Sequence, residues 1–163
     1  MSKPKQDHYI IYTDGACKGN PGPGGYGVYA QLGDTVTELS KGYKHTTNNR
    51  MEVMAVIAAL EEFGPGIKVD IYTDSDYTIK AATKWIKGWA RNNWVTYNTG
   101  LPVKNRDLHM VFNELLKLNK VKFHWVRGHS GNFGNEKADK LASDACANPE
   151  TIDVGYMRSI GAI

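Results

Sequence analysis

The pattern of apolar and polar positions along the chain predicts short buried strands separated by helices. The tetrapeptide Ile-Tyr-Thr-Asp occurs twice, at residues 11–14 and 71–74, and a small residue follows the aspartate each time. Runs of β-branched and aromatic residues of this kind predict strands that stop at the aspartate. Three more strands are predicted, and Gly33-Asp34 joins two of them in a hairpin; their ranges are residues 26–32, 36–44 and 121–126.

A segment rich in glycine and proline, residues 17–25, separates the first two predicted strands. Proline cannot serve a central strand and glycine permits tight turns, so we expect a loop in this segment. The segment lacks the spacing and the lysine of a phosphate-binding P-loop, which excludes that interpretation.

Apolar residues at helical spacing predict four helices. The first follows the N-capping residues 46–49 and stops at Gly64, which places Glu52 in its first turn. The second covers residues 75–91, with a break near Gly88. The other two cover residues 106–118 and about 135–147, and we expect Asp139 in the first turn of the last helix.

The order of these elements brings two aspartates together. Three antiparallel strands, a crossover helix and a fourth strand allow the two Ile-Tyr-Thr-Asp strands to lie parallel and adjacent. Asp14 and Asp74 then emerge at one edge of the sheet, about 4.8 Å apart by strand spacing. Open α/β sheets bind ligands beyond this edge. Two carboxylates so close repel each other unless a proton or a metal ion lies between them.

Length and composition fit one domain with a single core. The chain has 163 residues, of which 41% are hydrophobic and 23% charged. Its longest apolar run, residues 53–60, is far shorter than a bilayer span. Cys17 and Cys146 form no Cys-x-x-Cys pair, and the N-terminal residues lack the apolar centre of a secretory signal. We expect a protein of the reducing cytoplasm without membrane association.

Positive charge is concentrated in one segment. Residues 77–106 contain six basic residues and no acidic one, although the net charge of the chain is only +3. Several of these basic residues share one helical face, with Trp85 and Trp89 beside it. The pattern fits either a solvated helix face with buried tryptophans or a groove that binds a nucleic-acid backbone.

Four carboxylates have reasons to converge: Asp14 and Asp74 from strand ends, Glu52 and Asp139 from helix starts. Carboxylate oxygens suit Mg²⁺ or Mn²⁺, whereas zinc prefers histidine or cysteine. A cluster of about four acids can hold two metal ions roughly 3.5–4 Å apart, the arrangement used for in-line phosphoryl displacement.

The chain resembles bacterial type 1 ribonuclease H (ribonuclease HI) in a series of motifs that occur in order between about residues 9 and 156. These motifs are Thr13-Asp14-Gly15, Gly19-Asn20-Pro21-Gly22, Thr46-Thr47-Asn48-Asn49-Arg50-Met51-Glu52, Thr73-Asp74-Ser75, Pro102-Val103-Lys104-Asn105, Gly128-His129-Ser130-Gly131, and Asn135-Glu136 with Ala138-Asp139. The resemblance implies an α/β fold of the ribonuclease H type. Its five-stranded mixed sheet has three antiparallel strands followed by parallel strands, with helices on both faces.

The resemblance also implies the domain limits. Residues 9–148 would form a single ribonuclease H domain, in which residues 83–100 correspond to the basic handle of the family. Residues 1–8 would be a flexible N-terminal tail. Residues 149–163 would be a C-terminal tail, to which the sequence assigns no role.

The implied activity is hydrolysis of the RNA strand of an RNA–DNA hybrid, which leaves 5′-phosphate and 3′-hydroxyl ends. The family's catalytic residues fall on Asp14, Glu52, Asp74, His129 and Asp139, and its metal ligands on the four carboxylates. Two Mg²⁺ ions would bind in the substrate complex, with Mn²⁺ as a substitute. We expect a monomer without an obligate protein partner. The expected substrate contacts are Cys17, Asn20, Thr47, Asn48, Asn49, Trp85, Trp89, Arg91 and Trp94.

Two departures from the family pattern bear on substrate binding. Asp76 stands where the family often has glutamine, so it could repel phosphate or bind additional metal. Residues 91–94 carry less positive charge than the handles of bacterial relatives, which predicts weaker hybrid affinity and a shallower dependence on salt. Two alternatives stay open: a DNA-strand transferase of the same fold and a non-catalytic hybrid-binding module.

Overall fold

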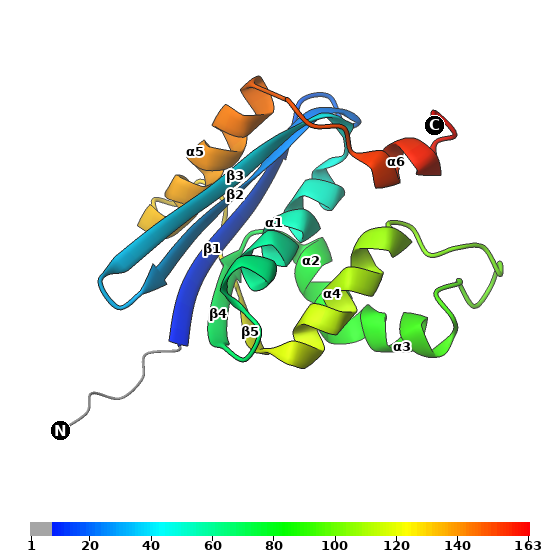
Figure 1. Ribbon diagram of the computed structural model, residues 1–163, viewed down its shortest axis with the longest axis horizontal. Helices are drawn as coiled ribbons and strands as arrows, with labels where there is room; N and C mark the ends of the chain where they lie inside the picture. Colours follow the sequence, from blue (N-terminus) through cyan, green and yellow to red (C-terminus); the bar gives the residue numbers. More distant parts are fainter. Residues whose placement is uncertain (1–7) are drawn as a thin grey trace.

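The computed structural model describes residues 8–163, which form one five-stranded sheet with helices on both faces (Figure 1). The strand order is β3-β2-β1-β4-β5. The strands are β1 His8–Cys17, β2 Gly22–Leu32, β3 Thr35–Thr46, β4 Lys68–Thr73 and β5 Lys120–Trp125. The helices are α1 Asn48–Phe63, α2 Asp76–Lys80, α3 Ile86–Arg91, α4 Arg106–Leu118, α5 Phe133–Ala147 and α6 Val154–Ser159.

The two identical tetrapeptides pair with each other in register. β1 and β4 are parallel neighbours in which Ile11 lies opposite Ile71 and Tyr12 opposite Tyr72. β2 pairs antiparallel with both β1 and β3, while β5 pairs parallel with β4. The predicted sheet, with antiparallel strands followed by parallel ones, is therefore confirmed.

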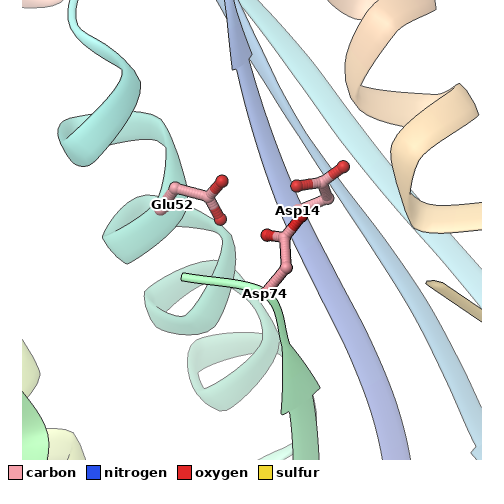
Figure 2. A group of neighbouring side chains, drawn as sticks. All are labelled: Asp14, Glu52 and Asp74. Atoms are coloured by element: carbon pink, nitrogen blue, oxygen red, sulfur yellow. The ribbon is translucent and has the colours of Figure 1, made fainter. Parts of the chain in front are cut away.

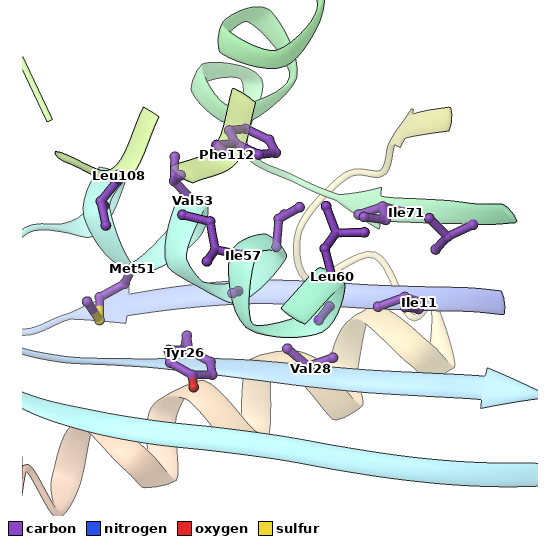
Figure 3. Packing of buried hydrophobic residues seen from close by; sticks show 14 of the residues in the cluster. Ile11, Tyr26, Val28, Met51, Val53, Ile57, Leu60, Ile71, Leu108 and Phe112 are labelled. Atoms are coloured by element: carbon purple, nitrogen blue, oxygen red, sulfur yellow. The ribbon is translucent and has the colours of Figure 1, made fainter. Parts of the chain in front are cut away.

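The main hydrophobic core lies between the sheet and α1 (Figure 3). Apolar side chains of α1 pack against those of the central strands. Phe112 of α4 joins the same core, and its ring packs edge-on against Phe123 of β5. Ile11, Val56 and Ile71 are fully buried in this layer. α5 covers the opposite face of β1, β2 and β3.

β2 starts at Gly22, so the expected loop over residues 17–25 is shorter than predicted. Two glycines of β2 serve close packing: Gly25 falls inside the expected loop, and Gly27 falls in the strand predicted after it. A Cβ on Gly25 would lie 2.7 Å from the backbone nitrogen of Cys146, and one on Gly27 would lie 2.3 Å from the carbonyl oxygen of Ala138. Glycine therefore lets α5 lie directly on β2, a contact between distant segments that local sequence rules do not predict.

Both helices that carry candidate acids begin earlier than predicted. α1 starts at Asn48 behind the N-cap Thr47, whose hydroxyl accepts from the backbone N–H of Arg50. α5 starts at Phe133 behind the N-cap Asn132. Glu52 and Asp139 therefore lie in second turns, and the expectation of first-turn positions is wrong for both.

The predicted helix over residues 75–91 is interrupted, but the break lies before Gly88 and is a π-helical turn. A π-helical turn, Ala81–Trp85, separates α2 from α3. Gly88 lies inside α3, where a Cβ would meet nothing within 4 Å. The extra residue of the π-turn rotates the helix face between its two halves. Ring contacts of Trp85 with Tyr77 and with Trp89 accompany this change.

The C-terminal segment packs on the domain, whereas most of the expected N-terminal tail cannot be compared with the structure. Residues 1–7 of the expected N-terminal tail lie outside the described residues, and His8 already belongs to β1. Residues 149–163, to which the sequence assigned no role, pack on the domain. Thr151 forms a bridge with Tyr43, Asp153 is buried, and α6 follows. Among the helices of residues 8–163, none is long and apolar enough to cross a bilayer.

Candidate active site

Asp14 and Asp74 meet where the parallel pairing of β1 with β4 ends. β4 stops at Thr73, and Asp74 follows it directly. β1 does not stop at Asp14 as predicted but continues to Cys17 along β2. Asp14 therefore lies on a strand that passes the end of its neighbour. The expected meeting of the two aspartates at this edge is confirmed, since oxygens of their carboxylates lie within 4.8 Å of each other.

Glu52 completes a compact acidic cluster. One carboxylate oxygen from each of Asp14, Glu52 and Asp74 lies within 4.8 Å of the others. Figure 2 shows the three carboxylates converging from β1, α1 and the end of β4. Asp14 and Glu52 are each 5% exposed, and Glu52 Oε2 has no hydrogen-bond partner among the described residues. A buried carboxylate oxygen without a partner is costly, so the site is suited to a cation.

The cluster strongly disfavours full ionisation. Burial, followed by the charges of Asp74 and Asp139, raises the pKa of Asp14 to about 8. Burial and the charge of Asp14 raise the pKa of Glu52 well above its ordinary value. Burial also raises the pKa of Asp74. A divalent cation would remove this repulsion, and carboxylate oxygens are the ligands that Mg²⁺ and Mn²⁺ prefer.

Asp139 and His129 border the cluster. The carboxylate of Asp139 on α5 is close enough to contribute to the raised pKa values of Asp14 and Asp74. It is not part of the set within 4.8 Å. His129 Nδ1 lies 4.0 Å from Asp139 Oδ2, and the imidazole is 82% exposed on the loop before α5. The imidazole thus lies on the solvent-exposed side of the acidic cluster, next to Asp139.

Two glycines shape the site, and sequence reasoning gave them no role there. A Cβ on Gly15 would lie 2.5 Å from the backbone nitrogen of Glu52, so glycine lets β1 pass close to α1. A Cβ on Gly128 would lie 2.6 Å from Asp74 Oδ2. Both glycines stand inside motifs of the family resemblance, which was the available signal. Only the folded structure shows that Gly15 accommodates the backbone of α1 and Gly128 the carboxylate of Asp74.

Most of the expected groove contacts lie around the N-terminus of α1. Asn20 Oδ1 accepts from the backbone N–H of Asn48 at 3.0 Å, which joins the loop after β1 to the helix start. Asn49 is exposed beside them. Cys17 is half-buried, and its thiol lies 3.5 Å from the carbonyl oxygen of Thr46. Thr47 caps α1.

The expected handle contacts form a separate group beside α4, where the ring of Trp89 packs against that of His109. Trp89 and Trp94 pack partly against the hydrophobic core, and Trp85 stacks at a tilt on Trp89 with ring centroids 5.6 Å apart. Arg91 is exposed. The tryptophans are thus half-buried. They fit both interpretations that the sequence left open, since each ring packs partly in the protein and still presents a surface to a ligand. Asp76, the departure from the family pattern, forms an ion pair with Lys80 at 2.8 Å and is not part of the acidic cluster.

Fold and site together define a class of protein: an α/β domain with a mixed sheet that presents a buried acidic cluster, suited to a metal ion, where its central parallel strands end. The RNase H family model matches residues 6–147. Ribonuclease H of Bradyrhizobium sp. (strain ORS 278) is 51% identical over 137 residues, which are 84% of this chain and 88% of that protein. Ribonuclease H of Rhodopseudomonas palustris (strain TIE-1) is 49% identical over 144 residues, 88% of this chain and 92% of that protein. The chain belongs to the RNase H family.

Solved structures agree with this assignment. LC9-RNase H1, described as a type 1 RNase H with the type 2 active-site motif, superposes with a TM-score of 0.79 at 28% identity, over 94% of this chain and 78% of that chain. LC11-RNase H1 in complex with RNA/DNA hybrid superposes with a TM-score of 0.63 at 25% identity, over 86% and 97% of the two chains.

Proposed function

We propose that this protein hydrolyses the RNA strand of RNA–DNA hybrids and leaves 5′-phosphate and 3′-hydroxyl ends. The observation that carries the proposal is the convergence of Asp14, Glu52 and Asp74 within 4.8 Å at the end of the parallel strand pair. Two findings on similar proteins support the substrate. Curated relatives at about half identity are named Ribonuclease H, and LC11-RNase H1 was solved with an RNA/DNA hybrid.

The four carboxylates Asp14, Glu52, Asp74 and Asp139 would hold two Mg²⁺ ions, with Mn²⁺ as a substitute. The unpartnered oxygen of Glu52 and the raised pKa of Asp14 support this role, since both are relieved when a cation binds. When bound, the metal ions supply a nucleophilic hydroxide at neutral pH and stabilise charge on the leaving oxygen.

The side chains themselves orient the reaction. Asp14 and Asp74 are fixed by the paired strands β1 and β4, so their carboxylates hold one geometry without reorganisation. Glu52 is held by the buried face of α1. His129 stands on an exposed loop with glycines at 128 and 131, within 4.0 Å of Asp139. It would accept or relay a proton near the scissile phosphate.

Substrate choice would come from the shape and sugars of the hybrid. A hybrid shows 2′-hydroxyls on one strand only, in a wide and shallow minor groove. Asn20, Asn48 and Asn49 beside the acidic cluster would contact this groove, together with backbone groups near Cys17. Thr47 with Trp85 and Trp89 would contact the DNA strand, and Arg91 and Trp94 would add contacts at the handle. Little base preference is expected, because such contacts address sugars and phosphates.

The proposal includes the setting in which the protein acts. Cys17 and Cys146 are free thiols in the structure, which suits the reducing cytoplasm. The acidic cluster is built from one chain, so a monomer is sufficient for the activity. Sedimentation or light scattering at assay concentration would test the monomer.

Cleavage of end-labelled hybrid, duplex RNA and duplex DNA in Mg²⁺ tests the function. We expect the wild type to cut only the RNA strand of the hybrid. Asp14→Asn should bind the hybrid and leave it intact. End analysis of the products should show 5′-phosphates. Binding without cleavage in both Mg²⁺ and Mn²⁺ would contradict the proposal and favour a non-catalytic hybrid-binding module. Joining of DNA ends would favour a strand transferase.

A further inference from the structure

A groove of about 920 Å³ lies at the N-terminal end of α1, one turn before the helix reaches Glu52. Asn20, Thr47 and Asn49, which are expected to bind substrate, form one of its walls. The remaining wall comes from the start of α4 and from α6 in the C-terminal segment. Figure 1 shows α6 beside the place where the chain leaves the handle and enters α4. The C-terminal segment therefore completes a surface that begins at the candidate active site.

Positive charge lines this groove without compensation. Lys104, Arg106 and Arg158 belong to its lining, and none of them forms an ion pair within residues 8–163. Asp107 is the carboxylate of the lining, but both its oxygens accept from Arg50, at 2.8 and 2.7 Å. The charges available to a ligand in the groove are thus all positive.

α6 is held at the groove by a buried network. Asp153 caps α6 by accepting from the backbone N–H of Tyr156. Its carboxylate also accepts from Arg50 Nε at 2.8 Å and from the hydroxyl of Thr46 at 2.7 Å. A Cβ on Gly155 would lie 2.0 Å from Asp107 Oδ2, so glycine lets α6 approach the ion pair. The wall is a built part of the domain, and its helix carries the exposed Arg158 at the groove.

We propose that Arg106 and Arg158 bind the sugar-phosphate backbone of the hybrid and extend its contact surface from Thr47 to α6. A guanidinium offers planar, paired donors that match the oxygens of a phosphate. The two arginines lie in the same groove as the expected contacts Asn20, Thr47 and Asn49, so one continuous stretch of backbone can meet all of them. The contact rests on the proposed function, and it supplies positive charge that the handle, with its asparagines at 92 and 93, lacks.

The test compares Arg106→Gln, Arg158→Gln and the double variant with the wild type on labelled hybrid over a salt series. Each substitution should raise KM and the Kd for hybrid about 3–10-fold near 0.1 M salt, while kcat at saturation stays within twofold. The slope of log Kd against log salt should fall by about one for each arginine removed. Arg158→Lys should keep the slope, because it keeps the charge. On hybrids too short to reach from the acidic cluster to α6, the effect of Arg158→Gln should disappear.

Lys122→Gln is the matched control, because Lys122 is exposed on β5 and does not line the groove. An equal loss of affinity in this control would overturn the inference, since it would reduce the effect to net charge. A double variant whose KM and salt slope equal those of the wild type would also overturn the inference. Cleavage of the hybrid by the wild type would in that case leave the proposed function standing. Failure of the proposed function is separate: the wild type would then not cut hybrid at all. Thermal unfolding of each variant verifies the fold.

Discussion

The ring of Tyr12 on β1 stacks on the ring of Tyr72 on β4, with centroids 5.0 Å apart and planes 23° from parallel. Tyr72 stacks in turn on His124 of β5, with centroids 4.6 Å apart. These contacts accompany the in-register pairing of the two identical tetrapeptides. The register has a direct consequence for the site: each candidate aspartate follows its stacked tyrosine by two residues. The pairing of Tyr12 with Tyr72 therefore also brings the two carboxylates to the same position along the strand direction.

Asp14→Asn should stabilise the metal-free protein at alkaline pH. Burial raises the folded-state pKa of Asp14 to about 8 from the ordinary value of 3.8. Between these values the folded state holds a proton that the unfolded state has lost, so the stability of the wild type falls as the pH rises through this window. The substitution removes this loss. We therefore expect the free energy of unfolding to rise by roughly 1–3 kcal/mol near pH 8. The gain is limited because the buried amide still lacks full solvation.

Thermal unfolding in a chelator between about pH 4 and pH 8 measures the effect, which should shrink toward the acid end. Mg²⁺ should then raise the Tm of the wild type and leave that of Asp14→Asn nearly unchanged. An equal Mg²⁺ response in both proteins would contradict the assignment of Asp14 as a metal ligand.

Gly128→Ala should lower activity with little effect on folding. The new Cβ would lie 2.6 Å from Asp74 Oδ2, so the carboxylate must turn away from the cluster. We expect a loss of at least about 10-fold in kcat, since displacements near 1 Å at a catalytic group cost on the order of 100-fold. A weaker shift of Tm by Mg²⁺ would show that the change acts on the metal site.

Gly88→Ala is the control for this substitution. Gly88 is helical, and a Cβ there meets nothing within 4 Å. The variant should keep full activity and gain about 0.5–1 kcal/mol of stability, as alanine does over glycine in a helix. Full activity in Gly128→Ala would show that Asp74 adapts to the added methyl group.

Gly27→Ala should destabilise the whole domain. Its Cβ would lie 2.3 Å from the carbonyl oxygen of Ala138 and 2.7 Å from the backbone nitrogen of Ala142, both in α5. Helix and strand must separate, which costs about 1–3 kcal/mol or more in a packed interior. Urea unfolding measures the change. Because α5 also carries Asp139, we expect activity to fall further than stability alone explains. An unchanged urea midpoint would mean that α5 moves away from β2 without loss of stability.

Substitution of the two carboxylates around Arg50 should give unequal losses of stability. Asp153 is 3% exposed and pairs with a guanidinium that is itself buried, so Asp153→Asn should cost roughly 3–5 kcal/mol. Asp107 is 46% exposed, and solvent screening reduces the cost of Asp107→Asn to about 0.5–1 kcal/mol. Chemical unfolding at neutral pH compares the two variants. Equal costs would contradict this dependence on burial.

The pH dependence of Asp107→Asn has a definite sign. Burial tends to raise the pKa of Asp107, but the Arg50 guanidinium outweighs it and holds that pKa below the usual range. The carboxylate therefore contributes stability above about pH 4 and loses it as the pH falls through its folded-state pKa. The stability difference between wild type and Asp107→Asn should accordingly vanish in strong acid. A difference that grows on acidification would contradict the ion pair.

The sequence by itself determined most of the elements and the meeting of the central strands. Strand runs, the Gly33-Asp34 turn and the helical spacing of apolar residues are local patterns, and each follows from backbone geometry and side-chain alternation. The repeated Ile-Tyr-Thr-Asp added one long-range fact, the pairing of β1 with β4. These features predict the convergence of Asp14, Glu52, Asp74 and Asp139; the structure brings the first three within 4.8 Å of one another and leaves Asp139 at the border of the cluster.

The tertiary structure decided what depends on contacts between distant segments. Gly27 appeared to belong only to a predicted strand, until the backbone of α5 was found against it. Residues 149–163 had no periodic pattern, yet Asp153 reaches Arg50 across 103 positions of sequence and fixes α6 at the groove. Gly128 had no visible role until Asp74 lay beside it. Close approach and charge pairing are properties of positions in space, so a local pattern carries no record of them.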